Sequence, residues 1–386
     1  MNAKEFTRRY YTDRRNTNCI KWDAETAKGK LPVWIADTDF RVPEEVTENL
    51  KKKLDEGTYG YGFLPEDYFD RMISWNEKIS GITYKKEWIR FSKGAIDGLN
   101  QLIRCLTEEN DAILINTPVY HPFSDTIKSC RRRVVESPLT DNDGLFEMDF
   151  KDIERKIRRN RVKMMILCTP HNPVGRVWTE DELKQLFAIT HKYHVIVISD
   201  EVHSELIMPG HRFIPSLSFS RYRNEIITLN AESKTFSLAL FSHCHVIIPN
   251  RRYRALFDRY QKDHHCDHPN AFNGLSSYFS YGCGEEWLEG FNQVIFENYQ
   301  YMKKKLEPYC VLPPLEGSYL VYADFSRSIN DGTAYDFLYN KCAVYPNPGE
   351  IFGKGYEKWA RFNLATSLSN IRKLCRKIEE GFRDMR

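Results

Sequence analysis

The chain has 386 residues, of which 41% are hydrophobic and 28% are charged, a composition typical of a soluble globular protein. Its length predicts two domains, or one large domain with a smaller one attached. The formal net charge of +3 is too small to indicate a nucleic-acid-binding protein. The arginine-rich runs at 131–133 and 158–161 could bind phosphate, but we interpret them as solvated faces of surface elements.

Cysteine usage and hydropathy indicate the compartment. The ten cysteines stand singly, without a Cys-x-x-Cys pair, and no signal peptide is recognised. No apolar run approaches the roughly 18 residues that a membrane span needs. The sequence therefore predicts a cytoplasmic protein with free thiols and no membrane contact. The cluster from His264 to His268 lacks the spacing of a zinc-finger or helical metal site, so we expect a polar loop there and no metal.

Five short apolar runs mark the candidate strands in the first two thirds of the chain. They lie at 111–115, 163–168, 195–198, 225–229 and 246–248. Near-continuous apolar runs of this length are typical of strands that are covered on both faces. The pattern therefore predicts a mostly parallel sheet between helices.

A helical pattern between two of these runs indicates an α/β alternation. Thr179 can cap a helix, with Glu182 as its capping-box partner, and the helix then runs to about Tyr193. Because strand, helix and strand follow one another along the chain, we predict a large doubly wound α/β domain over residues 45–285.

The C-terminal part has a different pattern. A helical stretch at about 285–307 precedes a strand at 318–322, a Pro/Gly loop at 345–349, a strand near 359–364 and a final helix. This order predicts a smaller α+β domain over residues 286–386. We expect the N-terminal arm, residues 1–44, to pack with it.

Polar side chains follow the central strands at the points where those strands end. Because the carboxyl ends of parallel strands lie along one edge of a sheet, these side chains are expected to converge at a ligand site. They are Tyr120, Asn172, Asp200, His203 and Lys234. Taken singly, each has an ordinary explanation: a core tyrosine, a turn, a helix cap, a structural histidine and a surface lysine. Their shared position is what favours a site.

Pyridoxal phosphate is the cofactor whose chemistry needs this set of side chains. Its aldehyde forms a Schiff base with a lysine amine, and a carboxylate keeps its ring nitrogen protonated so that the ring can accept electrons. Lys234 and Asp200 fit those two roles. Asn172 can donate a hydrogen bond to the phenolic oxygen of the ring, and Tyr120 can stack on the ring face.

The phosphate and the substrate need further groups. A helix that begins at Gly94-Ala95-Ile96 offers its N-terminus to the phosphate, and the hydroxyl group of Ser233 can assist. An amino-acid substrate brings a carboxylate, which a guanidinium binds well. Arg361 can supply one from the smaller domain, although taken alone it could equally be a surface ion-pair residue.

The chain resembles fold-type I pyridoxal-phosphate enzymes of the class I/II aminotransferase superfamily, and within it the bacterial MalY/PatB group of cystathionine β-lyases. The resemblance runs nearly from end to end. The segments that carry it are 14–23, 31–40, 59–62, 172–175, 200–203, 233–236 and 361–363.

The resemblance implies roles that the residues alone do not. Tyr61 corresponds to a tyrosine that reaches the cofactor phosphate of the neighbouring subunit, which implies a homodimer with shared active sites. Asp37, Arg361 and Tyr120 are placed at the substrate, and His203 near the cofactor. The implied fold is a large domain with a mostly parallel sheet between helices plus a smaller α+β domain.

The implied activity is β-elimination from an L-cysteine-derived thioether, which yields a thiol, pyruvate and ammonia. Arg361 would bind the substrate carboxylate and Lys234 would remove the α-proton. Two alternatives stay open. An aminotransferase acting on an L-amino acid uses the same residues, whereas a cofactor-binding regulatory protein would have little turnover.

The sequence also departs from the family pattern. Ala231 stands where relatives often have serine, and Leu240 and Phe241 stand where smaller residues are expected. The segment from Ser242 to His245 is unusual as well. We expect these positions to affect substrate choice or activity.

Overall fold

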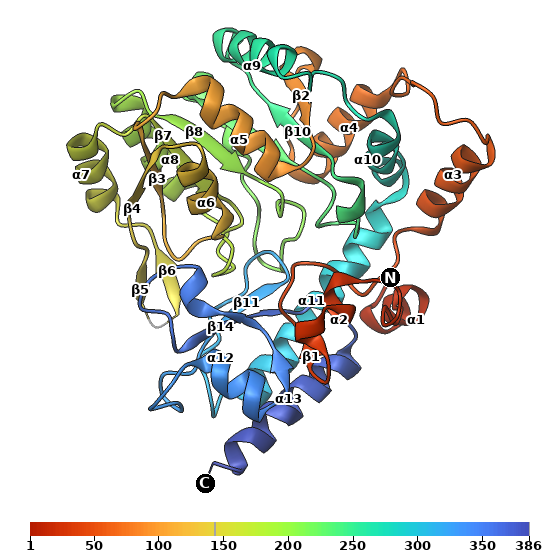
Figure 1. The fold of residues 1–386 in the computed structure, drawn as a ribbon, viewed down its shortest axis with the longest axis vertical. Helices are drawn as coiled ribbons and strands as arrows, with labels where there is room; N and C mark the ends of the chain where they lie inside the picture. Colours follow the sequence, from red (N-terminus) through yellow and green to blue (C-terminus); the bar gives the residue numbers. More distant parts are fainter. Residues whose placement is uncertain (143, 386) are drawn as a thin grey trace.

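A seven-stranded sheet lies at the centre of the upper part of the molecule in Figure 1. It is seen in a computed structural model that describes residues 1–142 and 144–385. The strand order is β2-β10-β9-β8-β7-β3-β4. The strands are β2 (Ile89–Ser92), β3 (Ala112–Ile115), β4 (Arg133–Glu136), β7 (Met164–Cys168), β8 (Ile196–Asp200), β9 (Ile226–Asn230) and β10 (Cys244–Ile247).

The pairing within this sheet confirms the mostly parallel arrangement. Strands β9, β8, β7, β3 and β4 run parallel to one another. The run at 246–248 is the exception, because the strand there is β10, which begins at Cys244 and pairs antiparallel with both β2 and β9. An apolar run predicts burial on both faces but not strand direction, so the sequence pattern could not distinguish this strand.

Alternate residues of each strand face different helices. In β3, Ile113 and Ile115 belong to a cluster with α5, α6 and α9, whereas Leu114 belongs to the cluster that contains α7 and α8 residues. The sheet is therefore the middle of three layers, as expected for a doubly wound fold. The helices are α5 (Ala95–Leu106), α6 (Pro122–Ser129), α7 (Phe150–Asn160), α8 (Glu180–Lys192) and α9 (Arg251–Asp263).

Helix α8 begins as predicted. Thr179 Oγ1 accepts from the backbone N–H of Glu182, and Glu182 accepts in return from the backbone N–H of Thr179, at 3.2 and 2.8 Å. The helix ends at Lys192, one residue before the predicted end. Further helices lie together on the β2 side of the fold (Figure 1): α3 (Glu44–Asp55), α4 (Tyr68–Ser80) and α10 (Ala271–Cys283).

The lower part of Figure 1 contains a second, smaller sheet with the order β11-β14-β13. Its neighbours are the long helix α11 and the terminal helix α13. The elements are α11 (Glu285–Leu306), β11 (Leu320–Asp324), α12 (Ala334–Asp336), β12 (Val344–Tyr345), β13 (Asn347–Pro348), β14 (Trp359–Asn363) and α13 (Leu368–Arg383). A two-stranded ribbon, β5 (Thr140–Asn142) with β6 (Leu145–Glu147), lies between the two parts.

The N-terminal arm reaches this smaller part at two places. Strand β1 (Leu31–Pro32) pairs in parallel with β12. Helix α1 (Ala3–Tyr10) packs Phe6 on α11, where a Cβ atom on Gly290 would lie 2.6 Å from the Phe6 ring. The short helix α2 (Ile20–Asp23) follows α1 along the arm. Division of the chain at residues 44 and 285 stays a prediction.

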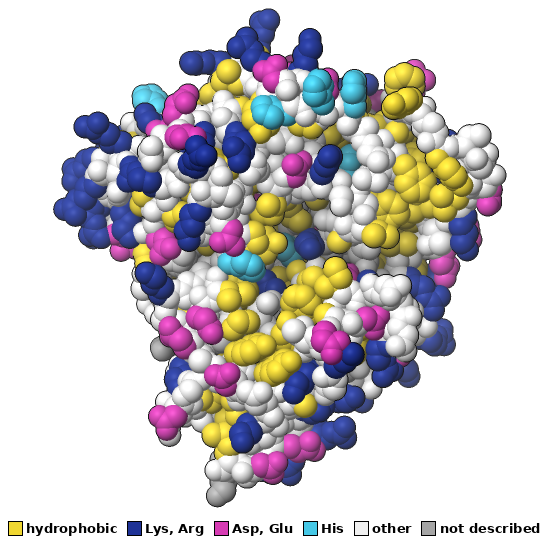
Figure 2. Space-filling model, in the orientation of Figure 1, with side chains coloured by type: hydrophobic (Ala, Val, Ile, Leu, Met, Phe, Trp, Pro, Cys, Tyr) yellow, Lys and Arg dark blue, Asp and Glu magenta, His cyan; other side chains and the backbone are white. Residues whose placement is uncertain are grey.

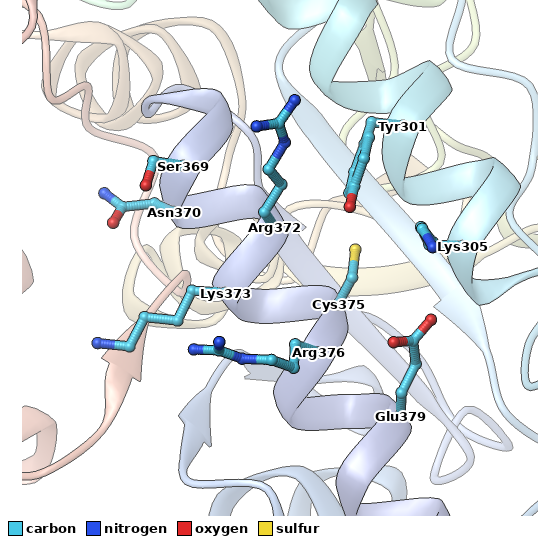
Figure 3. A pocket seen from close by; sticks show the side chains of 9 residues that line it. All are labelled: Tyr301, Lys305, Ser369, Asn370, Arg372, Lys373, Cys375, Arg376 and Glu379. Atoms are coloured by element: carbon cyan, nitrogen blue, oxygen red, sulfur yellow. The ribbon is translucent and has the colours of Figure 1, made fainter.

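A surface groove of about 470 Å³ is lined by residues of the packed helices α11 and α13 (Figure 3). Tyr301 and Lys305 stand on α11, and Cys375 and Glu379 extend from α13 toward that helix. The Arg372 guanidinium lies 5.6 Å from the centre of the Tyr301 ring. This groove contains none of the predicted site residues among those that the structure describes.

Two sequence-based expectations concern membranes and metals. Over the ranges 1–142 and 144–385, no helix combines the length and the apolar character that crossing a membrane requires. In the same ranges, no three or more His, Cys, Asp and Glu side chains are grouped as metal ligands. The segment at 264–268 follows α9, and the His264 ring stacks on Tyr260 with 4.0 Å between the ring centres.

Candidate functional site

The ends of the central strands are joined by backbone hydrogen bonds. Tyr120 N donates to Asn172 O at 3.0 Å, and Thr169 N donates to Asp200 O at 3.0 Å. Glu201 N donates to Leu229 O at 2.9 Å, which ties β8 to the strand that precedes Lys234. The structure thus brings the predicted strand-end residues onto one edge of the sheet.

Lys234 lies at the centre of this edge. Its Nζ donates to Ala36 O at 2.9 Å, a contact between residues 198 positions apart. Burial lowers the pKa of Lys234, and the Arg361 charge lowers it further, while Asp37 and Asp200 oppose the shift. The neutral amine, the form that can form a Schiff base or accept a proton, is therefore favoured relative to a surface lysine.

Asp200 is a buried carboxylate at the end of β8. Its Oδ1 accepts from Val202 N at 3.1 Å. Burial raises the pKa of Asp200 to about 6, and the hydrogen bond from Val202 and the Lys234 charge oppose this rise. A buried carboxylate of this kind favours a cation beside it, so its environment fits a protonated ring nitrogen.

Arg361, on β14, comes from the smaller part and is buried against the strand-end residues. Its Nη1 donates to Asn172 Oδ1 at 3.0 Å, and its Nη2 donates to Trp34 O at 2.8 Å and to Asn347 Oδ1. Burial lowers its pKa to about 10, so it stays charged at neutral pH. Within the described chain, its buried Nε has no hydrogen-bond partner, which leaves a donor for a ligand.

The Arg361 contact also orients Asn172. Because the amide oxygen of Asn172 accepts from Arg361, its NH₂ group is left to donate. This is the orientation that a hydrogen bond to the phenolic oxygen of pyridoxal phosphate requires. Tyr120 is half-buried beside this pair, and burial raises its pKa while Arg361 lowers it.

His203 is buried, like Asn172 and Asp200. Its Nδ1 is 3.2 Å from Ser318 Oγ, and its ring meets Tyr319 edge-on. Burial, with the Lys234 and Arg361 charges, lowers the pKa of His203 to about 3, so the ring is neutral. This environment resembles that of a structural histidine, and a direct role at the cofactor stays a prediction.

Helix α5 begins beside this edge. Gly94 has φ = +140°, a backbone conformation that favours glycine, and no described side chain caps the helix. The first-turn amides, including those of Ala95 and Ile96, are thus available to an anion. Gly98 brings the helix close to the sheet, since a Cβ atom there would lie 2.7 Å from Ser92 Oγ. Ser233 is half-buried next to Lys234.

Tyr61 does not join this group in its own chain. It is fully exposed, as is Phe63, and Tyr59 is 72% exposed. Figure 2 shows hydrophobic side chains gathered on the right, over α3 and the segment that follows it. Leu240 is 91% exposed on the short turn Ala239–Phe241, and the Phe241 ring lies 6.1 Å from the ring of Phe272.

Sequence reasoning did not find a buried polar cluster at the start of β10. The Tyr68 hydroxyl lies 2.9 Å from His243 Nε2 and 2.7 Å from His245 Nε2. The signal was present, because His243, just before β10, and His245, within it, alternate with Cys244, which packs in the apolar core, and so point to one side of the chain. Burial lowers the pKa of His243 to about 4, so that ring is neutral.

Three glutamates share this interior. Burial raises the pKa of each to about 7: Glu201, Glu205 and Glu232. Trp75 Nε1 donates to Glu205 Oε1 at 2.6 Å, and Ser276 Oγ donates to Glu232 Oε1 at 3.4 Å. In the part of the chain that the structure describes, one oxygen of Glu205 and one of Glu232 are buried without a partner. Neutral carboxyl groups are therefore favoured here.

Replacing Glu232 with glutamine should make the protein progressively more stable than the wild type as pH rises from about 5 to about 8. Burial raises the pKa of the Glu232 carboxyl group from its ordinary 4.5 to about 7. The stabilising contribution of this carboxyl group is therefore present at low pH and is lost as pH rises through 7. The free energy of unfolding falls by about 3 kcal/mol at most over this range, because the neighbouring carboxyl groups share the cost of carrying a buried charge. Thermal unfolding at several pH values measures the difference in stability between the variant and the wild type, and substitution of the exposed Glu77 by glutamine is the control. A difference that does not change with pH would contradict the prediction.

Comparison with known proteins places this site in a family. The family model named aminotransferase class I and II matches residues 36–378. Cystathionine β-lyase PatB of Bacillus subtilis is 33% identical over 377 residues, which covers 95% of this chain and 97% of PatB.

Two solved structures match over nearly the full length. A pyridoxal-phosphate-bound protein of Clostridium difficile, described as an aminotransferase, has a TM-score of 0.93 and 34% identity, and the match covers 97% of this chain and 99% of that one. Cystalysin of Treponema denticola, which contains pyridoxal 5′-phosphate, has a TM-score of 0.92 and 31% identity, covering 97% and 98%. The predicted fold-type I architecture is thereby confirmed.

Proposed function

The chain belongs to the class I and II aminotransferase family, and from this premise we propose that it is a pyridoxal-phosphate-dependent carbon–sulfur β-lyase. The substrate would be an L-cysteine-derived thioether, and the products a thiol, pyruvate and ammonia. One observation carries this proposal: a lysine, an acid, an amide and an arginine meet at one sheet edge in a chain that is 33% identical to a cystathionine β-lyase over 95% of its length.

The residues at this edge fit pyridoxal phosphate. The buried carboxylate of Asp200 needs a cation, the NH₂ group of Asn172 is free to donate, and the first turn of α5 presents amides to an anion. Lys234 would hold the aldehyde, and Tyr120 and Ser233 would contact the ring and the phosphate. When bound, the cofactor supplies an electron-accepting ring that stabilises a carbanion at Cα of the substrate.

The protein's own residues supply binding and proton transfer. Arg361 would bind the substrate carboxylate through its unpartnered Nε, because a buried cation without a carboxylate favours one. Lys234, which burial shifts toward the neutral amine, takes the α-proton once it is released from the cofactor. The hydrogen bond from Lys234 Nζ to Ala36 O supports this role, because it fixes the amine beside the N-terminal arm.

A cystathionine assay tests the β-lyase proposal. We expect pyruvate to form without any keto-acid acceptor, in equal amount with the thiol. An aminotransferase would instead convert the cofactor to its amine form and release no pyruvate. A regulatory protein would show cofactor absorbance with negligible turnover of any amino acid, and either result would overturn the proposal.

We also propose a homodimer whose active sites are completed by Tyr61 of the partner subunit. The exposed aromatic segment at 59–63 supports this, because large exposed apolar side chains in one stretch are typical of a contact surface. Sedimentation of the cofactor-loaded protein tests it, and a monomer with full activity would contradict it. The ten cysteines are unpaired, which is typical of a reducing compartment and supports a cytoplasmic location.

A further inference from the structure

A short segment at residues 315–318, here called the strap, lies just before β11 and packs on the loop that carries Asn172. The backbone N–H groups of Glu316 and Gly317 both donate to Gly175 O, at 2.9 and 3.0 Å. Gly175 belongs to the loop after β7, and its φ of +76° favours glycine. A Cβ atom on Gly317 would lie 2.8 Å from a side chain of the same loop. The strap and the loop are therefore in direct contact along their backbones.

The strap also holds the loop that follows β8. Met208 N donates to Glu316 O at 2.9 Å, and Ser318 N donates to Leu206 O at 2.7 Å. Ser318 Oγ lies 3.2 Å from His203 Nδ1. Ser318 has φ = +70°, which is uncommon for a residue with a side chain, so the contacts around it impose this conformation. One segment thus fixes the loops that leave two neighbouring strands of the central sheet.

A buried ion pair fastens the strap to the Asn172 loop. Arg176 Nε donates to Glu316 Oε2 at 2.9 Å, and the same oxygen accepts from Val177 N at 2.7 Å. The side chains of Arg176 and Glu316 are 7% and 11% exposed. Nη2 of Arg176 lies 3.1 Å from a second carboxylate, that of Glu182 at the start of α8. Arg176 thus has two carboxylate partners, and of these two only Glu316 belongs to the strap.

The strap continues into the strand that lies beside Arg361. Strand β11 begins at Leu320 and pairs antiparallel with β14, where Tyr322 lies opposite Arg361. Arg361 in turn donates to Asn172 Oδ1 at 3.0 Å. The strap is therefore connected both to the loop that carries the proposed cofactor contact and to the sheet that carries the proposed substrate contact.

We propose that Glu316 and Arg176 are positioning residues, which together hold Asn172 at the cofactor and Arg361 at the substrate carboxylate. The inference rests on the proposed function, which gives Asn172 and Arg361 these roles. An ion pair with a structural role alone would contribute to stability and leave ligand binding unchanged. A positioning role predicts weaker binding once the pair is broken, because a displacement of about 1 Å in an active site can cost about 100-fold in rate.

The dissociation constant for pyridoxal phosphate, measured on the full-length chain, tests the proposal. Glu316→Ala removes the acceptor of two hydrogen bonds and should weaken cofactor binding by about 10-fold or more. Glu316→Gln keeps one oxygen that can accept from both donors, so it should stay within about threefold of the wild type. Glu182→Ala is the matched control, because it also removes a carboxylate from Arg176 but does not touch the strap. It should bind the cofactor like the wild type, even if its unfolding temperature falls.

Two further measurements separate positioning from stability. In Glu316→Ala, the pH at which the visible band of the lysine-bound cofactor is lost should rise by about 1 unit, because a phenolic oxygen without the Asn172 hydrogen bond holds the nearby proton more strongly. KM for cystathionine should rise by about 10-fold with a smaller change in kcat, because Arg361 is then displaced from the substrate carboxylate. Glu182→Ala should change neither the band nor KM.

Gly317→Ala gives a second test that leaves the ion-pair residues in place. Its Cβ atom would lie 2.8 Å from Val177 Cγ2, so it should separate the strap from the Asn172 loop and weaken cofactor binding in the same way. Folded Glu316→Ala and Gly317→Ala proteins with wild-type affinity would overturn the proposal, as would an equal loss of affinity in Glu182→Ala. A wild type that binds the cofactor but cleaves no thioether contradicts the lyase proposal alone, so the two failures are distinguishable.

Discussion

Lys234→Ala should abolish β-elimination and the visible absorption band of the lysine-bound cofactor. The loss of kcat/KM should be at least about 10³-fold, because the same amine holds the cofactor and transfers the α-proton. The burial-lowered pKa of Lys234 is what prepares this amine for both roles. Absorbance of the purified protein and pyruvate release from cystathionine measure the two losses together.

The control for this prediction is a lysine outside the site. Lys184 is exposed on α8, and Lys184→Ala should retain both the band and the activity. Added methylamine, a free amine that can enter the space of the missing side chain, should restore part of the proton transfer in Lys234→Ala. A Lys234→Ala protein that keeps the original band would show that another residue holds the cofactor.

The strand-end residues could be predicted because one physical rule connects sequence to position. Apolar runs predict buried parallel strands, and the first polar residues after them must lie at the carboxyl edge. Asp200 follows from this rule directly, and Lys234 follows from it together with the need of pyridoxal phosphate for a lysine amine; the two lie close enough for the Lys234 charge to lower the pKa of Asp200. The rule concerns local pattern and needs no knowledge of what packs above the edge.

The strand-end rule could not place the covering segment for the same reason, and only the family resemblance put Asp37 at the substrate. Ala36 and Lys234 are 198 residues apart, and their contact depends on the tertiary placement of the N-terminal arm, which has no local signature. The ion pair between Arg14 and Asp37 joins residues 23 positions apart, and no local sequence pattern predicts such a pair. The direction of β10 was missed because burial on two faces is the same for either orientation.

The structure changes the interpretation of Leu240 and Phe241, the two residues that are larger than the family pattern predicts. Leu240 is almost fully exposed, so its bulk does not fill the space around Lys234 in its own chain. The side chain extends from the turn Ala239–Phe241, whose neighbour Phe272 belongs to α10, the helix that follows the exposed polar segment at 264–268. If the proposed dimer forms, Leu240 and the aromatic segment at 59–63 are candidates for its contact surface.

Asp200→Ala should lower kcat/KM for cystathionine by roughly 10³-fold while leaving the fold intact, because no carboxylate then keeps the ring nitrogen positive. The carboxylate is buried, and its pKa of about 6, which the Val202 amide and the Lys234 charge only partly oppose, reflects the cost of that burial. A positive ring nitrogen would lower the pKa again, so binding of the cofactor and ionisation of Asp200 favour each other. Stopped-flow measurement of pyruvate release and cofactor titration report the two effects separately.

A cofactor with a permanently charged ring distinguishes this role from a structural one. N-methylated pyridoxal phosphate carries its positive charge without a carboxylate partner, and Asp200→Ala removes the side chain that would face the ring nitrogen. It should restore at least about a tenth of the lost activity in Asp200→Ala and none in Lys234→Ala, because the two residues act at different atoms. Exposed Asp70→Asn controls for charge removal alone and should behave as the wild type. If Asp200→Ala loses equal activity with pyridoxal phosphate and with its N-methylated form, Asp200 maintains the structure of the β8 edge. Its proposed role at the ring nitrogen would then be wrong.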